Sequence, residues 1–369
     1  MRKLASIRLI QGVEPIAGKD RVELATVDGW TCMVSKADGF KHGDKCVFCE
    51  PDSVFPQTEQ WEFLRKYNFR IKTQKFKDGN GLPVYSQGLV LPLTTPQIAA
   101  LKEINVGDDV TSLLGITQYE PPMDKERNVS NTTKRHYPKW LMRHAWFRKL
   151  VAPRKQNVDF PSFISKTDEE RIQNCPDILG QDLRWVATEK VDGQSGTFVV
   201  LRRNSLFFKR YEFIVCSRNL RIPKPDGRSY WVVAEKYGIC KGLTQWLEDH
   251  KQYRWVALQG ECIGPDVQGN KYKVREYDLF VFNFITPEGR RDSLTAKAEV
   301  ERMGMKFVPV LSENESLMGK TVNDVLNMAN GKSVLNPDAL REGIVFREAK
   351  AGRLSFKAVS PEFLYKNGE

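Results

Sequence analysis

Several common signals are absent from this 369-residue chain. It has no run of roughly 18 or more apolar residues, so the sequence predicts no membrane-spanning helix. Residues 1–8 carry charges where a secretory signal needs an apolar segment, so we expect an intracellular protein, cytoplasmic or virus-encoded, that is not secreted. The H-E-x-x-H and G-x-S-x-G motifs are also missing, which counts against zinc proteases and α/β-hydrolases.

Cysteine and histidine are too few and too scattered to form a disulfide framework or a zinc site. Seven cysteines is an odd number in a chain of this length, which predicts reduced thiols. Cys46 and Cys49 have C-x-x-C spacing, but no second pair or nearby histidine follows, and a structural zinc site needs about four ligands. His136 and His144 have no acid or cysteine cluster beside them. Zinc is therefore not expected.

Residues 264–271 have the glycine spacing of a phosphate-binding loop without its other requirements. Asn270 interrupts the G-K-[ST] ending, and Pro265 is unfavourable for entry into a helix. We therefore do not expect a Walker site in this stretch.

The net charge of +11 is concentrated in the middle of the chain. Residues 120–160 hold ten basic and four acidic side chains, whereas residues 1–119 are nearly balanced. A concentrated basic stretch favours a polyanionic partner, with nucleic acid ahead of a membrane surface. The alternative is a solvated linker whose charge only keeps it soluble. Length and composition predict domains over 1–119 and 161–369, joined by a basic linker over 120–160.

Residues 1–119 have the pattern of a small β-barrel. Short apolar runs alternate with turns, and Asp28-Gly29 separates two runs that fit a hairpin. This pattern predicts an OB-like barrel, a fold that suits nucleic-acid binding. The runs expected to form strands are 4–10, 22–27, 30–34, 46–50, 89–93 and 110–114.

Aromatic and basic residues interleave between Trp61 and Lys77. Such a stretch can stack bases and hold phosphates. The alternative is that the aromatic rings fill the barrel while the cations face water.

Residues 161–369 predict an α+β domain dominated by antiparallel strands. Ser165 or Thr167 can cap a helix whose first turn is acidic, and further helices are expected near 231–248 and 293–303. The expected strands are 185–187, 197–200, 213–218, 255–261, 279–285, 343–347 and 354–359.

Lys190 stands in a K-x-D-G motif between two of these strands. A lysine attacks phosphorus only as a neutral amine, and its unperturbed pKa is about 10.4. A nearby cation, burial or a bound metal must therefore lower that pKa. The motif is weak evidence alone, because an exposed lysine before a turn has the same pattern.

Five further short motifs follow Lys190 in a fixed order. They are Ser217-Arg218, Gly260-Glu261, Phe280-Val-Phe282-Asn283, Glu342-Gly343-Ile-Val-Phe-Arg347 and Ser355-Phe-Lys357. The ordered set resembles the covalent nucleotidyltransferase superfamily of polynucleotide ligases and mRNA-capping enzymes. Residues 166–174 resemble the opening of RNA ligase domains. The N-terminal OB module of one type of ATP-dependent RNA ligase is similar to residues 2–8, 27–30, 43–46 and 86–89.

The resemblance implies an ATP-dependent RNA ligase that acts in three steps. Lys190 attacks the α-phosphorus of ATP and releases pyrophosphate, AMP passes to a 5′-phosphate RNA end, and a 3′-hydroxyl then displaces AMP. It also implies Mg²⁺ or Mn²⁺ as the metal, and RNA, in a nicked duplex, as the partner of a monomeric enzyme. These residue types fit phosphoryl transfer, which depends mainly on in-line positioning and charge neutralisation.

The same motifs imply roles for eight residues. The catalytic set is Lys190, Asp192, Glu342 and Lys357. The nucleotide-binding set is Glu189, Lys190, Arg218, Glu261, Phe282, Glu342 and Lys357. The metal set is Asp192, Glu261 and Glu342. Within these sets Lys357 and Arg218 meet phosphate charge, and Phe282 stacks on adenine.

Each assignment has a structural alternative. Phe280, Phe282 and Phe284 alternate along one strand, so any of them can be a core residue; Phe282 is preferred because it precedes Asn283. The carboxylates can be ordinary strand-edge residues, with Arg218 as a partner for one of them.

The closing motif departs from the family pattern, which often has two lysines. The first of these positions is Ser355 here. Either Lys357 makes the α-phosphate contact alone, or Lys350 or Arg353 assists it.

Two other functions share parts of this pattern. An mRNA-capping guanylyltransferase has the lysine motif, and a catalytically dead relative would only bind RNA. Capping enzymes and ordinary DNA ligases place an OB domain after the nucleotidyltransferase domain, whereas here twelve residues follow Lys357. A dead scaffold has no need of Lys190. Both arguments favour the RNA ligase.

Overall fold

The computed structural model describes most of the chain outside its basic middle segment. The described residues are 3–101, 103–119, 159–166, 168–203, 210–222, 225, 227, 229–350 and 352–368. The predicted linker over 120–160 therefore lies, apart from its last two residues, outside the described residues. No helix in the described part is long and apolar enough to cross a membrane.

The N-terminal part is a strongly bent five-stranded sheet with the order β3-β2-β1-β4-β8. Its centre is the long strand β1 (Ala5–Pro15), which pairs with β4 through its first half and with β2 through its second half. The register shifts between Ile10 and Gly12, and such a bulge bends a strand and lets a sheet curl into a barrel. The other strands are β2 (Val22–Val27), β3 (Trp30–Ser35), β4 (Lys45–Cys49) and β8 (Leu89–Leu91).

Short strand pairs and single turns complete this OB-like barrel. The pairs are β5 (Ser53–Val54) with β9 (Thr117–Gln118) and β6 (Gln74–Lys77) with β7 (Pro83–Ser86); the helical elements are η1 (Lys36–Asp38), η2 (Glu59–Tyr67) and α1 (Pro96–Ala99). The predicted hairpin at Asp28-Gly29 is confirmed, because β2 pairs with β3 across it.

Two details of the barrel differ from a simple strand pattern. The expected strand over 110–114 is wrong: this run is a turn, whose Val110 and Leu114 side chains are buried. The apolar side chains of this run are buried in the core, although the run itself does not form a strand. In the interleaved stretch, Trp61 and Phe69 are buried while Phe63 is 52% exposed. The rings at 61 and 69 therefore fill the barrel.

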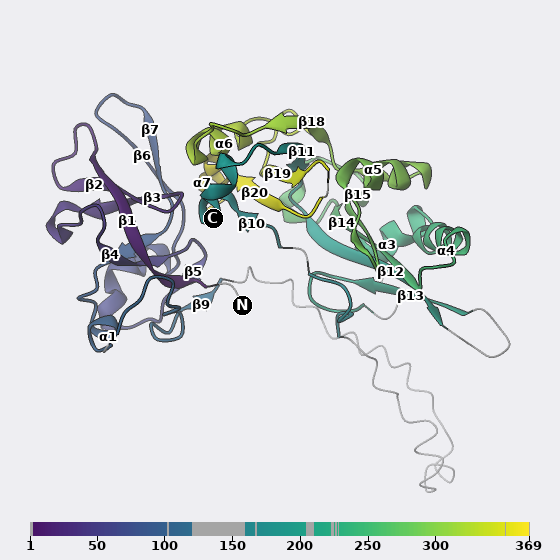
Figure 1. Ribbon diagram of the computed structural model, residues 1–369, viewed down its shortest axis with the longest axis horizontal. Coiled ribbons are helices and arrows are strands. Elements are labelled where there is room, and N and C mark those ends of the chain that lie inside the picture. The colour runs from purple at the N-terminus through teal and green to yellow at the C-terminus, as the bar shows by residue number, and fades with distance from the viewer. Residues whose placement is uncertain are drawn as a thin grey trace, which may run out of the picture.

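The C-terminal part contains two sheets, most of whose strands are labelled in Figure 1. The first has the order β10-β20-β19-β11-β18, and the second has the order β13-β12-β14-β15-β16 with β17 paired to β15. The first sheet contains β10 (Glu170–Arg171), β11 (Arg184–Lys190), β18 (Val310–Ser316), β19 (Gly343–Glu348) and β20 (Ser355–Val359). The second contains β12 (Gln194–Arg203), β13 (Arg210–Cys216), β14 (Trp255–Ile263), β15 (Asp278–Thr286), β16 (Gly289–Arg290) and β17 (Lys306–Phe307).

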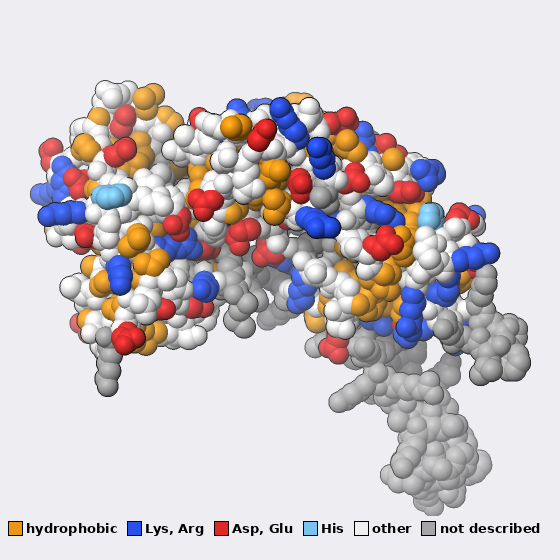
Figure 2. Space-filling view, viewed as in Figure 1, with side chains coloured by type: hydrophobic (Ala, Val, Ile, Leu, Met, Phe, Trp, Pro, Cys, Tyr) orange, Lys and Arg blue, Asp and Glu red, His pale blue; other side chains and the backbone are white. Residues whose placement is uncertain are grey.

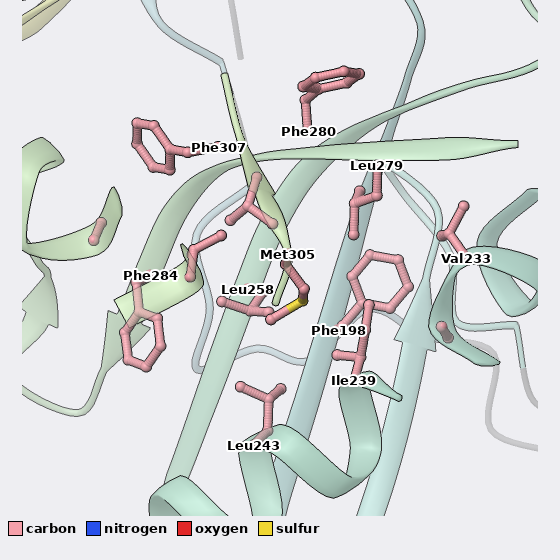
Figure 3. Close-up of a cluster of buried hydrophobic side chains, with 14 of the residues drawn as sticks. Phe198, Val233, Ile239, Leu243, Leu258, Leu279, Phe280, Phe284, Met305 and Phe307 are labelled. Atoms are coloured by element: carbon pink, nitrogen blue, oxygen red, sulfur yellow. The ribbon is translucent and has the colours of Figure 1, made fainter. Parts of the chain in front are cut away.

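The helices of this part are α3 (Ser229–Lys236), α4 (Ile239–Asp249), α5 (Ser293–Arg302), α6 (Val322–Ala329) and α7 (Pro361–Asn367), with short turns η4 (Ile172–Asn174), η5 (Pro176–Gly180) and η6 (Gln268–Asn270). Helices α3, α4 and α5 cover one side of the second sheet, and α6 packs on one face of the first. The largest buried cluster lies between α3, α4, α5 and the second sheet, and Figure 3 shows Phe198, Leu258 and Phe284 within it. The α+β class predicted for this half is confirmed. The acidic helix predicted after Ser165 is wrong, because β10 occupies that position.

Asn174 makes several of the hydrogen bonds between the barrel and the two-sheet part. The Asn174 side-chain oxygen accepts hydrogen bonds from the Trp30 indole at 2.7 Å and from Arg8 at 3.1 Å. Its amide nitrogen donates to Glu50 at 3.0 Å and to Glu170 at 2.9 Å. Gly29 adds a backbone contact with residue 173, and a Cβ on Gly29 would collide with that backbone. The hairpin glycine is thus required by close packing between the two parts.

Asn174→Ala should destabilise this junction. The fully buried Trp30 indole N–H would lose its acceptor, and an unsatisfied buried donor costs about 1–3 kcal/mol. For a protein of this size we expect the calorimetric midpoint to fall by roughly 1–4 °C. Asn219→Ala is the matched control, since Asn219 is exposed and bonds the Lys166 side chain. Equal midpoints for the two variants would contradict this account of the junction.

Candidate active site

Three adjacent strands bring the two candidate lysines onto one face of the first sheet. Thr188 on β11 pairs with Val345 on β19, which pairs with Lys357 on β20. Side chains alternate between faces along a strand, so Lys190 shares the face of Thr188 and Lys357. The other face, which includes Ile344, packs into a separate buried cluster.

Lys190 is the last residue of β11, and the chain then crosses from one sheet to the other. β12 begins at Gln194, and it pairs with β13 and β14 rather than with β11. Only residues 191–193 make the crossing. The K-x-D-G motif therefore lies at the seam between the two sheets, where side chains from both can meet.

The Lys190 ammonium forms an ion pair with Glu342, which immediately precedes β19. The distance from Nζ to Oε1 is 2.6 Å, and both side chains are mostly buried. Burial alone would lower the pKa of Lys190, but the carboxylates of Glu342, Glu261 and Asp192 outweigh it and raise the pKa above its usual value. Lys190 is thus held as an ammonium, and incoming phosphate or metal charge must displace this balance before it can act as a nucleophile.

Glu261 on β14 belongs to the same group of charges. It accepts a hydrogen bond from the backbone N–H of Gly193 at 3.1 Å. Burial raises the pKa of Glu261 to about 8; Lys190 opposes that rise, and the Glu342 and Asp192 carboxylates add to it. The seam therefore places three carboxylates near Lys190.

These carboxylates fit a divalent cation that also binds the substrate. Within the described residues, no three or more His, Cys, Asp and Glu side chains are arranged to hold a metal by themselves. Mg²⁺ and Mn²⁺ prefer oxygen ligands, and Mg²⁺ is commonly held by one or two carboxylates together with water and phosphate oxygens. Burial and the neighbouring carboxylates raise the pKa of Glu261, so a cation bound here would favour its charged form. The donors are thus suitable for a metal that is completed by phosphate.

Lys357 lies on the same face of the sheet as Lys190, but its pKa is shifted in the opposite direction. Burial lowers its pKa to about 8; Asp168 opposes this shift through an ion pair at 2.9 Å, while Arg171 and Lys190 reinforce it. Arg218 also reaches Asp168, at 3.8 Å, from an exposed position after β13. Lys357 and Arg218 are therefore linked through one exposed carboxylate, which an anionic substrate can replace.

Ser355, which occupies the position of a common family lysine, is surrounded by arginines. Its hydroxyl bonds the Glu169 carboxylate and accepts from Arg290 at 3.1 Å. Glu169 pairs with Arg290 at 3.0 Å and with Arg347 at 3.1 Å. The cation next to Ser355 is therefore Arg290, which the sequence comparison overlooked in favour of Lys350 or Arg353.

Glu189 is directed away from the lysine face. Its carboxylate accepts hydrogen bonds from the Ser333 hydroxyl at 2.5 Å and the Val334 N–H at 2.8 Å, and burial raises its pKa. The side chain fixes the loop that leads to Glu342. The structure therefore does not bring the Glu189 carboxylate together with the other predicted residues.

Phe282 is the extra residue of a β-bulge. Asn283 pairs with Gln259 and Val281 pairs with Gly260, so Phe282 has no partner in the ladder. A bulge redirects a side chain out of the regular alternation. Phe284 is fully buried, whereas Phe282 is half-buried and its ring centre lies 6.0 Å from the Arg347 guanidinium. Phe282 is therefore an aromatic ring near the seam that a planar ligand can reach.

A polar cavity of about 340 Å³ adjoins Lys357 at the junction of the barrel and the two-sheet part. On the face drawn in Figure 2, acidic and basic side chains are intermingled around this junction. The cavity is lined by Lys3, Arg8, Glu50, Asp168, Glu169, Glu170, Arg171, Asn174 and Lys357. The sequence analysis did not assign residues 168–171 to the site, although an acidic run beside an arginine is a signal that charged ligands could be bound there.

Family models match both parts of the chain. A model described as an OB-fold domain matches residues 4–93, and the RNA ligase model matches residues 183–359. No curated protein matches this sequence.

Solved structures of Naegleria gruberi RNA ligase are similar to the whole chain. The structure with PPi has 32% sequence identity and a TM-score of 0.78, and the alignment covers 99% of each chain. A lysine-to-methionine mutant of that ligase with AMP and Mn gives the same values. A glutamate-to-alanine mutant with ATP and Mn has 31% identity and a TM-score of 0.77, again with 99% of each chain covered.

Proposed function

From the premise that this chain belongs to the RNA ligase family, and is an ATP-dependent RNA ligase that uses a divalent metal, we propose that it joins 3′-hydroxyl and 5′-phosphate RNA ends within a nicked duplex. The reaction passes through a lysyl–AMP intermediate and an adenylylated 5′ end. The observation that supports this proposal most directly is the placement of Lys190. It lies at the seam of two sheets, 2.6 Å from Glu342 and on the same face as Lys357.

In the first step Lys190 Nζ forms a bond to the α-phosphorus of ATP. The bond from that phosphorus to the bridging oxygen of the β-phosphate breaks, and pyrophosphate leaves. Lys190 must lose its ammonium proton, and Glu342 Oε1 is the carboxylate oxygen in contact with it. Lys357 and Arg218 compensate phosphate charge when the substrate displaces Asp168.

A divalent cation supplies further charge neutralisation when it is bound. Asp192, Glu261 and Glu342 are the residues proposed to hold it. Their own contacts also fix the lysine turn, since Glu261 binds the N–H of Gly193. Water exclusion and in-line geometry then depend on the mostly buried surroundings of Lys190.

In the later steps AMP passes from Lys190 to the terminal phosphate oxygen of the 5′ end. The RNA 3′-hydroxyl then attacks the same RNA phosphorus, a phosphodiester bond forms, and AMP departs. The barrel and the basic segment over 120–160 are proposed to hold the duplex beside the nick, because cations bind phosphates in any sequence context. The protein is further proposed to act as an intracellular monomer, without a membrane partner.

The test is to incubate the protein with α-labelled ATP or α-labelled GTP and metal, and to measure label on the denatured protein. Label from ATP alone, followed by sealing of a nicked RNA duplex with 3′-hydroxyl and 5′-phosphate ends, is the expected result. Label from GTP alone would point to a capping-type guanylyltransferase. Absence of label from protein free of bound AMP would refute lysyl–AMP chemistry. Equal sealing of single strands would refute the nick preference.

Phe282→Leu should weaken ATP binding with little effect on folding. Stacking of a base on an aromatic ring contributes about 1–3 kcal/mol, so the KM for ATP should rise roughly 5- to 100-fold. The matched control is Phe284→Leu, because Phe284 is fully buried in the main core. That change should lower the unfolding midpoint and leave KM nearly unaltered. The reverse pattern would show that Phe284, and not Phe282, serves the nucleotide.

A further inference from the structure

The segment over 264–273, which resembles a phosphate-binding loop only in its glycines, lies against the turn that follows Lys190. The Tyr272 hydroxyl accepts a hydrogen bond from the N–H of Asp192 at 2.8 Å. The Lys271 ammonium forms an ion pair with the Asp192 carboxylate. Gln268 donates to the carbonyl of Gly193 at 3.5 Å. Three residues of this segment therefore hold two consecutive residues of the K-x-D-G motif.

The backbone of this segment is held in an unfavourable conformation. Gln268, Asn270 and Lys273 have φ values of 47°, 49° and 53°, in the left-handed region that residues other than glycine seldom adopt. Such a conformation persists only where surrounding contacts fix it, and it is common at functional sites. Here the Asn270 side chain closes a turn with Val274 through two bonds of 2.9 Å.

Further contacts fix Lys271 itself. Its carbonyl accepts from the Asn336 amide at 2.8 Å. Its ammonium also lies 4.4 Å from the centre of the Phe363 ring on α7, a favourable cation–π position. The Lys271 side chain is 26% exposed and Asp192 is 12% exposed, so the pair stands at the edge of the site. These contacts hold Lys271 in place in addition to its ion pair with Asp192.

These contacts leave Asp192 with little freedom. Its backbone N–H is bound by Tyr272 and its carboxylate by Lys271. The next residue, Gly193, is bound through its N–H by Glu261 and through its carbonyl by Gln268. An error of about 1 Å in the position of a reacting group can cost on the order of 100-fold in rate. Lys271 fixes the position of the Asp192 side chain, and it therefore influences the direction of the Lys190 amine.

We propose that Lys271 is a positioning residue for adenylyl transfer, which orients Asp192 and, through it, the turn that carries Lys190. This inference rests on the proposed lysyl–AMP chemistry. Lys271 does not contact the reacting atoms; it acts through Asp192. Its loss should consequently slow the chemical step and leave the affinity for ATP nearly unchanged.

The test compares Lys271→Met, Lys271→Arg and the control Lys273→Met in single-turnover adenylylation. Lys273 is two residues away, and its partner Asp338 is exposed and outside the site. We expect Lys271→Met to lower the maximal rate roughly 10- to 100-fold with KM for ATP within about threefold of the parent. Lys271→Arg should recover most of the rate, and Lys273→Met should match the parent.

Equal rates for Lys271→Met and Lys273→Met would overturn the proposal, as would a loss expressed only in KM. Tyr272→Phe provides a second measurement if Lys271→Met does not fold, since it removes only the acceptor of the Asp192 N–H. A fall in maximal rate without a change in KM is expected there too, and an unchanged rate would count against a positioning role for this segment. Absence of label on the parent protein would instead refute the proposed function.

Discussion

Lys190→Met is expected to abolish covalent AMP attachment while the final sealing step survives. Methionine has a similar length but no amine, so no bond to the α-phosphorus can form, and the adenylylation rate should fall by at least about a thousandfold. In the proposed reaction, Lys190 is needed only until AMP has moved to RNA. The variant should therefore still join a nicked duplex whose 5′ end already carries AMP. The measurements are label on denatured protein and sealing of both nicked substrates.

Lys306→Met is the matched control for this change. Lys306 also pairs with a buried carboxylate, Asp278 at 2.6 Å, but it lies at the paired end of β17 and β15. It should retain normal adenylylation. Residual label on Lys190→Met equal to that of the control would mean that another group carries AMP. Loss of sealing at the pre-adenylylated nick would mean that Lys190 also acts after transfer.

The order of the motifs was sufficient to predict the class of this protein. Each motif is short and unspecific alone, but the set follows a fixed order along the chain. The strands around them stand out as short apolar runs, and β11, β12, β14, β15, β19 and β20 all lie where these runs stand. The pattern could not show that β11 and β12 belong to different sheets. Strand pairing is decided by contacts between distant residues, such as Lys190 with Gly343.

The features of the site that the sequence could not show depend on side-chain direction or on distant partners. Glu189 neighbours Lys190, but alternation along β11 sends its carboxylate to Ser333 on the other face. The bulge at Phe282 could not be read from three evenly spaced phenylalanines. Asp168 contacts Lys357 from 189 residues away in the sequence, and Arg290 contacts Ser355 from 65 residues away. No local pattern encodes such contacts.

The charges of the site form a system that substrate must reorganise. The carboxylates led by Glu342 raise the pKa of Lys190, and burial lowers the pKa of Lys357 to about 8. ATP brings negative charge and the metal brings positive charge, so their binding can shift the pKa values of both lysines at once. The order of events then follows from electrostatics: phosphate recruits the charged form of Lys357, and metal charge favours the neutral amine of Lys190.

Lys357→Arg should change the pH dependence of adenylylation. The pKa of Lys357 is lowered to about 8 by burial, so in the free enzyme its charged form is present below that pH and is lost above it. Lys190 has a raised pKa, so the fraction of neutral amine increases with pH throughout this range. For the parent, kcat/KM for ATP should rise with pH and flatten above about pH 8. An arginine stays protonated, so in Lys357→Arg the rise should continue.

Lys357→Met completes this test and separates charge from titration. Removal of the cation should lower kcat/KM roughly 100- to 1000-fold, since a preorganised contact to developing phosphate charge is lost. The bend near pH 8 should vanish as well, because the group that causes it is gone. If the bend remains at the same pH in all three proteins, it arises from ATP, metal or another side chain, and Lys357 is not the group whose charge limits the first step. A bend confined to the parent assigns that limit to the Lys357 ammonium.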